Sequence, residues 1–124
     1  MKYIYFTLLA AIVPRLLLAD VCPTTEKVKE RKISLDYEWT IDERRTLDDV
    51  LSVEKLYSAR IQNKGEFISC YYSGTKGLLR LDGKPEKGEC RVQLISGLWE
   101  PAETDGQVCR EDNIETCVYE INCE

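Results

Sequence analysis

From residue 33 to residue 41 the chain reads Ile33-Ser34-Leu35-Asp36-Tyr37-Glu38-Trp39-Thr40-Ile41, an unbroken alternation of apolar and polar side chains. Successive side chains of a β-strand point to opposite faces, so a period of two is typical of a strand with one buried face. We interpret Trp39, which belongs to the apolar set, as a core residue rather than a platform for a ligand. This stretch predicts a β-sheet as the main architecture.

A hairpin is predicted next. Residues 56–62 and 66–73 flank Asn63-Lys64-Gly65, a short connection whose glycine can take a positive φ. One face of the first strand would carry Tyr57, Ala59 and Ile61, and the other Ser58, Arg60 and Gln62. We expect a turn at 74–77, a strand at 78–81 and a polar loop at 82–88, which contains Pro85.

Later strands are predicted at 90–94 and at 117–121, the last of which would close the sheet. Cys90 is in phase with Val92 and Leu94, so its sulfur is expected to point inward. Residues 24–30 suit one or two helical turns capped by a threonine, and residues 46–53 suit either a short helix or a loop. Residues 112–115 suit a single turn. The predicted fold is mainly β, an antiparallel sheet with a short N-terminal helix, with an α+β fold as the alternative.

The opening residues 1–19 resemble a signal peptide. Lys2 is followed by an apolar run that holds no acidic residue and ends at Ala19, a suitable cleavage position. Pro14 and Arg15 interrupt the run, which is shorter than the ~20 apolar residues of a membrane-spanning helix. We therefore expect cleavage and no stable membrane insertion afterwards. Residues 20–124 form one predicted domain, large enough for a modest core.

Charge limits the possible partners. The leader holds two basic residues and no acidic one, so the remaining chain has 15 basic and 22 acidic side chains, a net charge of −7. This balance argues against nucleic acid and anionic membrane surfaces as partners.

The six cysteines all lie beyond the leader: Cys22, Cys70, Cys90, Cys109, Cys117 and Cys123. An even cysteine count in a short exported chain predicts a disulfide framework. Six cysteines allow fifteen pairings, and spacing alone leaves them open. Among these we favour a local bridge between Cys109 and Cys117.

The sequence offers no catalytic, cofactor or metal site. It contains no histidine, which removes the commonest general base and the commonest ligand of zinc. It also lacks a C-x-x-C pair, a glycine-rich phosphate loop and the spacing of a calcium loop. Paired carboxylates remain open, because a small glycan hydrolase needs only two of them. We expect no enzyme activity and no cofactor.

Aromatic residues are the better lead to a binding surface. Tyr71 and Tyr72 are neighbours on a predicted strand, so one should face the core and the other solvent. Trp99 lies between Gly97 and Pro101, a setting that suggests a loop. We select Tyr72 and Trp99 as the candidate binding surface, the alternative being that both side chains only cover the sheet.

The chain resembles a family of small exported bacterial proteins of unknown function. The resemblance rests on Cys22-Pro23 after the leader, on Trp39 in its strand and on the late pair Cys109 and Cys117. It also rests on segments 57–61 and 68–72, the second of which contains Cys70-Tyr71-Tyr72. The acidic insert near Asp42 and the extra Cys123 depart from the family pattern. The resemblance implies export, a single small domain and no assigned catalytic activity.

We therefore predict a periplasmic or secreted module that binds a protein, such as an envelope accessory, an inhibitor or a host-facing factor. The alternative function is a carbohydrate-binding protein, or a small glycan hydrolase that uses paired carboxylates.

Overall fold

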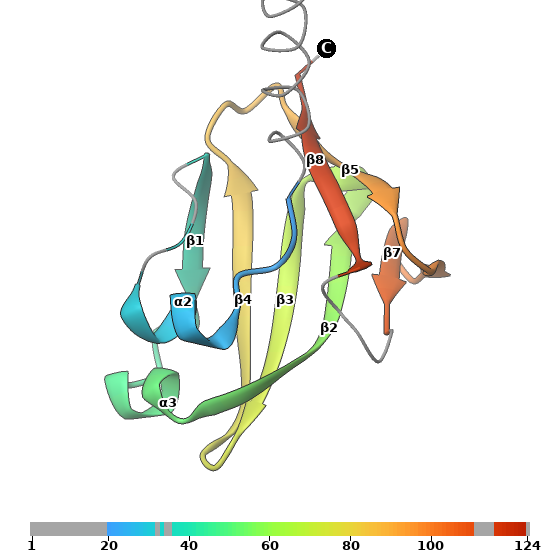
Figure 1. The fold of residues 1–124 in the computed structure, drawn as a ribbon. Helices are drawn as coiled ribbons and strands as arrows, with labels where there is room; N and C mark the ends of the chain where they lie inside the picture. The colour runs from blue at the N-terminus through green and yellow to red at the C-terminus, as the bar shows by residue number, and fades with distance from the viewer. Residues whose placement is uncertain (1–19, 32, 34–35, 111–115, 124) are drawn as a thin grey trace, which may run out of the picture.

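The computed structural model describes residues 20–31, 33, 36–110 and 116–123. The largest sheet is antiparallel and six-stranded, with the strand order β1-β4-β3-β2-β7-β6. The strands are β1 (Tyr37–Ile41), β2 (Val53–Gln62), β3 (Phe67–Gly74), β4 (Gly77–Pro85), β6 (Trp99–Ala102) and β7 (Gly106–Cys109). The prediction of a mainly antiparallel β fold is confirmed (Figure 1).

Strands β5 (Arg91–Ser96) and β8 (Val118–Asn122) form a separate two-stranded sheet. The strand expected at 117–121 therefore exists, but it does not close the main sheet as predicted. It lies against the face of that sheet, where Tyr119 and Val92 join the core (Figure 1). An isolated bridge between Tyr119 and Asp20 extends this small sheet on its other side.

Two short helices have the predicted threonine caps. Helix α2 (Thr25–Glu30) begins after Thr24, whose Oγ1 accepts a hydrogen bond from the Lys27 N–H at 3.3 Å. Helix α3 (Leu47–Leu51) begins after Thr46, which forms a reciprocal capping box with Asp49. Leu47 and Leu51 stay about half exposed, at 50% and 47%, so this helix buries less of its apolar side than its sequence suggests.

The hairpin of β2 and β3 is confirmed, and Gly65 has the expected positive φ of 92° within the short 3-10 turn η1 (Asn63–Gly65). Two register shifts interrupt β2, between Val53 and Lys55 and between Leu56 and Ser58. Such bulges change which face a side chain occupies, so the simple alternation predicted for this strand breaks down near Tyr57.

Strand β4 is longer than predicted. Residues 82–85, expected as part of a loop, pair with residues 37–40 of β1. Pro85 is compatible with this because it is the last residue of the strand, where the missing N–H disturbs the ladder least. At the start of β4, residues 74–77 form the tight turn that the sequence predicted.

The main sheet has an inner and an outer face. The inner face carries the core, to which β3 and β4 contribute residues that are at most 2% exposed: Ile68, Cys70, Tyr72, Leu79 and Leu81. The helices and the β5–β8 sheet pack on this side (Figure 1). Tyr37 and Val28 also belong to the core, and Trp39 packs against it as predicted.

Three disulfides join Cys22 to Cys70, Cys90 to Cys123 and Cys109 to Cys117. The predicted framework and the favoured local bridge are both confirmed. The Cys22–Cys70 bridge ties the segment before α2 to the central strand β3, and Cys90 is 4% exposed, as its phase predicted.

The turn expected at 112–115 lies outside the described residues. Within the part of the chain that the structure describes, no helix is long and apolar enough to cross a membrane.

Candidate functional site

The candidate site lies on the outer face of the six-stranded sheet, opposite the face that carries the helices and the β5–β8 sheet. Strand register arranges its side chains in rows. One row crosses all six strands through Thr40, Asp82, Ser69, Arg60, Val108 and Glu100. The next row contains Ser58, Tyr71 and Arg80. Residues from three separate sequence segments therefore meet at the centre of this face.

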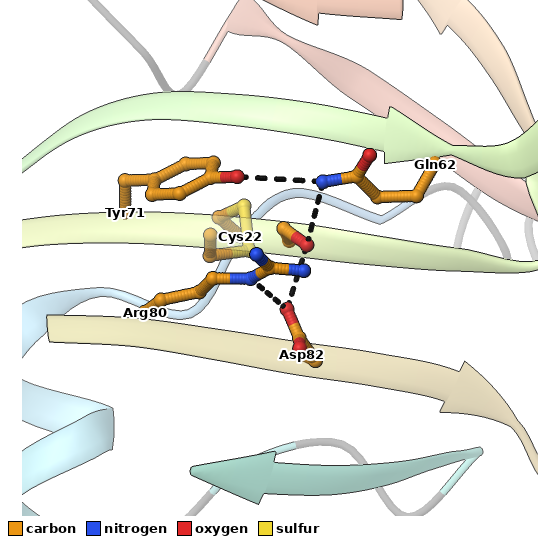
Figure 2. Close-up of polar contacts among 7 residues, drawn as sticks. Cys22, Gln62, Tyr71, Arg80 and Asp82 are labelled. Atoms are coloured by element: carbon orange, nitrogen blue, oxygen red, sulfur yellow. Dashed lines mark hydrogen bonds and ion pairs between the residues drawn. A yellow bond between two sulfur atoms is a disulfide. The ribbon is translucent and has the colours of Figure 1, made fainter. Parts of the chain in front are cut away.

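A hydrogen-bonded network connects the central side chains (Figure 2). Arg80 Nε donates to Asp82 Oδ1 at 2.8 Å, and Ser69 Oγ donates to the same oxygen at 2.6 Å. From β2, Gln62 Nε2 donates to Ser69 Oγ at 3.3 Å and to the Tyr71 hydroxyl at 3.4 Å. The network spans β2, β3 and β4 and fixes the positions of these groups relative to one another.

Aromatic rings flank the Arg80 guanidinium. Its central carbon lies 5.9 Å from the ring centroid of Phe67 and 5.9 Å from that of Tyr71. Both distances fall within the range of cation–π attraction. Tyr57, displaced by the bulge in β2, brings a third ring whose centroid lies 6.2 Å from that of Tyr71.

We call Gln62, Phe67, Ser69, Tyr71, Arg80 and Asp82 the outer-face cluster. The side chain of Arg80 is 47% exposed and that of Asp82 is 33% exposed, whereas Ser69 is fully buried. Partial burial opposes the positive charge of Arg80, but the hydrogen bond and the negative charge of Asp82 outweigh it and raise the arginine pKa. The cluster thus presents a permanently charged, preoriented cation between aromatic rings.

Tyr72 does not belong to this surface, so its selection as a binding residue was wrong. It is 0% exposed, and its hydroxyl donates to the Pro23 carbonyl oxygen at 2.6 Å. Burial raises the pKa of Tyr72 far above its ordinary value of 10. Of the two neighbouring tyrosines it is Tyr71 that faces outward, so the expectation that they would point to opposite sides is confirmed.

Trp99 lies apart from the outer-face cluster. It is the first residue of the edge strand β6, not a loop residue as predicted. It is paired with Cys109 and partly buried against the core, while its indole Nε1 donates to the Ser96 carbonyl oxygen at 2.8 Å. The structure therefore does not join Tyr72 and Trp99 in one surface. Leu98 beside it is 73% exposed.

The sequence held a signal that distinguishes the two tyrosines. Cys70 and Tyr72 are two residues apart on one strand, so an inward disulfide sulfur at Cys70 places Tyr72 inside as well. Arg80 and Asp82 share the outer face by the same period. Their pairing escaped prediction because Asp82 was assigned to a loop.

The cluster's chemistry suits recognition. Asp82 is its carboxylate, and one oxygen already accepts two hydrogen bonds. Ser69 donates to that carboxylate and has no imidazole beside it, since the chain contains no histidine. Among the described residues, no group of three or more histidine, cysteine or acidic side chains could hold a metal ion.

Comparisons with protein-family models, curated proteins and solved structures found no match to this chain. The resemblance to a family of exported bacterial proteins therefore stays a prediction.

Proposed function

We propose that the protein is an exported, non-enzymatic module that binds a protein partner through the outer face of its six-stranded sheet. The observation that carries this proposal is the outer-face cluster, where Arg80 stands between Phe67 and Tyr71 on a rigid sheet. Arginine and tyrosine are enriched among the residues that dominate binding energy in protein interfaces. A rigid sheet also reduces the entropy lost when they bind.

Charge on this face favours a partner of mixed polarity. Basic Arg80 and Lys84 lie near acidic Asp82 and Glu38, so the face is locally balanced although the chain carries a net charge of −5. Such a pattern fits a protein surface with complementary charges better than a polyanion.

Export is the second part of the proposal. Disulfides form and persist in oxidising compartments, and this chain has three. We infer cleavage after Ala19 and a periplasmic or secreted location. Intact mass of the natively produced protein, measured with and without reduction, tests both points. A mass that retains residues 1–19, or six free thiols, would contradict them.

A matched pair of arginine variants tests the binding surface. Arg44 is the control because, like Arg80, it binds an aspartate two residues away but lies off this face. Its Nε and Nη2 donate to Asp42 at 3.2 Å and 2.8 Å. We expect Arg80→Gln to weaken capture of the partner from envelope or host extract about 30-fold, the effect of a hot-spot residue. Arg44→Gln should leave capture unchanged. Equal capture by both variants would refute the proposed surface.

A glycan is the second candidate ligand. The observation that favours it is the proximity of Asp82, whose side chain is 33% exposed and can accept hydrogen bonds from hydroxyl groups, to the half-buried ring of Tyr71. Binding of oligosaccharides or peptidoglycan fragments that depends on Tyr71 would support this candidate, and no binding across a broad panel would end it.

A further inference from the structure

Asp20 is anchored unusually well for a residue beside a predicted cleavage position. Its backbone N–H donates to the Tyr119 carbonyl oxygen at 2.7 Å, and its own carbonyl oxygen accepts from the Tyr119 N–H at 2.9 Å. The Tyr37 hydroxyl donates to Asp20 Oδ2 at 2.8 Å. The backbone nitrogen of Asp20 is thereby fixed at the edge of the small β5–β8 sheet.

Asp20 lines a cleft of about 560 Å³ that carries more acidic than basic residues. Among the described residues of the lining, the acidic ones are Asp20, Asp36, Glu86 and Glu120, and the basic one is Lys87. Burial is the main cause that raises the pKa of Asp20; the hydrogen bond from Tyr37 lowers it, and the charges of Asp36 and Glu120 raise it further. While Asp20 is joined to Ala19, its backbone nitrogen is a neutral amide and contributes no positive charge to this cleft.

We propose that release of the leader turns this amide into a charge that stabilises the fold. This inference rests on the proposed export and cleavage after Ala19. A leader peptidase would hydrolyse the Ala19–Asp20 peptide bond: water supplies the oxygen of the new Ala19 carboxylate, and the Asp20 nitrogen leaves as an α-amino group that is protonated at neutral pH. This ammonium keeps its hydrogen bond to the Tyr119 carbonyl oxygen and adds positive charge to a cleft with an excess of carboxylates.

The pH dependence follows from the charges around the ammonium. Asp36, Glu86, Glu120 and the Asp20 side chain favour the ammonium, whereas Lys87 and the burial of this site oppose it. The pKa of the Tyr37 hydroxyl is raised, so this group is neutral at physiological pH. We expect the four carboxylates to outweigh burial and Lys87, and so to raise the pKa of the α-amino group above its ordinary ~7.7–8.0. Stabilisation is therefore complete below that ordinary value and is lost as the pH rises through the higher value of the folded state.

The test compares residues 20–124 with a free α-amino group against the same chain acetylated at that nitrogen. Acetylation keeps one N–H donor for Tyr119 but removes the charge. We expect the free form to have an α-amino pKa above the ordinary value and a gain of about tenfold in the folding equilibrium constant. Its Tm at pH 6.5 should be about 4–8 °C higher than that of the acetylated form. This gap should vanish near pH 10.5.

Two variants localise the effect. Glu120→Gln removes a carboxylate of the cleft and should shrink the Tm gap, whereas Glu43→Gln, which lies in a different cleft, should leave it unchanged. Equal Tm values for the free and acetylated chains at pH 6.5 would overturn this inference while leaving export intact. A natively produced protein whose first residue is not Asp20 would overturn both the proposed cleavage and the inference.

Discussion

Replacing the Cys22–Cys70 pair by alanine should destabilise the protein more than replacing the Cys109–Cys117 pair. All four cysteines are at most 2% exposed, so the cavities left by the missing sulfurs are similar in the two variants. The bridges differ in the chain length that they close, with sequence separations of 48 and 8. The comparison therefore isolates the effect of loop length on the unfolded state.

The loop-entropy relation gives the magnitude. It assigns about 4 kcal/mol to the longer loop and about 2.6 kcal/mol to the shorter one, a difference of about 1.5 kcal/mol. A loss of about 4 kcal/mol is a large part of the ~5–15 kcal/mol that stabilises an ordinary domain. Cys22→Ala/Cys70→Ala is therefore expected to leave a folded but marginal protein.

Urea denaturation without reductant, followed by circular dichroism, measures both double variants against the parent chain. With an m-value of about 1.5 kcal/mol per M, the Cys22/Cys70 variant should unfold at about 1 M less urea than the Cys109/Cys117 variant. Equal midpoints, or the reverse order, would refute the reasoning that these bridges stabilise mainly by constraining the unfolded chain.

Three further predictions test the packing and the capping. Tyr72→Phe should lower the free energy of unfolding by about 1–3 kcal/mol, because it leaves the buried Pro23 carbonyl without its hydrogen-bond donor. Tyr71→Phe on the outer face should lower it less. Chemical denaturation of the two variants compares these effects. Gly83→Ala should lower the free energy of unfolding by about 1–3 kcal/mol and shift tryptophan emission, because an added Cβ would lie 2.6 Å from the Trp39 ring. Unchanged emission would contradict this close contact. The pKa of Asp49 is lowered, chiefly because its carboxylate accepts a hydrogen bond from the Thr46 N–H. The cap of α3 should therefore be fully formed above the ordinary aspartate pKa and weaken as the pH falls through the lower pKa of the folded state. Amide exchange in α3 measures this pH dependence, which Asp49→Ala should abolish.

The sequence predicts strands wherever the period of two reflects one buried face. The alternation of Tyr37, Trp39 and Ile41 is reproduced in β1, and the hairpin around Gly65 forms as its turn chemistry indicates. Thr24 and Thr46 begin helices because each hydroxyl accepts from a backbone N–H that a helix start leaves unpaired.

Long-range pairing lay beyond local patterns. Pairing with β1 extends β4 through Pro85, and nothing within residues 82–85 indicates that partner. The separation of β5 and β8 from the main sheet likewise depends on contacts distant in sequence, including the Cys90–Cys123 bridge. The bulge near Tyr57 changes the parity of β2, which a simple alternation cannot foresee.

The candidate site was found only in part. The sequence identified the Tyr71-Tyr72 pair and placed Ser58, Arg60 and Gln62 on one face of their strand, but it did not show which tyrosine faces outward. The disulfide partners decide that question, because Cys70 pairs with the buried Cys22 and brings Tyr72 into the core. The Arg80–Asp82 pair then completes the surface from β4, whose local pattern predicts a strand only at 78–81.

The most direct test of the binding surface is site-specific photo-cross-linking. A benzoylphenylalanine would replace Tyr71 on the outer face in one chain and Leu47, which is 50% exposed on α3, in another. Both chains would be irradiated in the compartment to which the protein is exported. The account predicts a cross-linked partner at position 71 that disappears with Arg80→Gln, and none at position 47. A partner captured at position 47 but not at position 71 would contradict it.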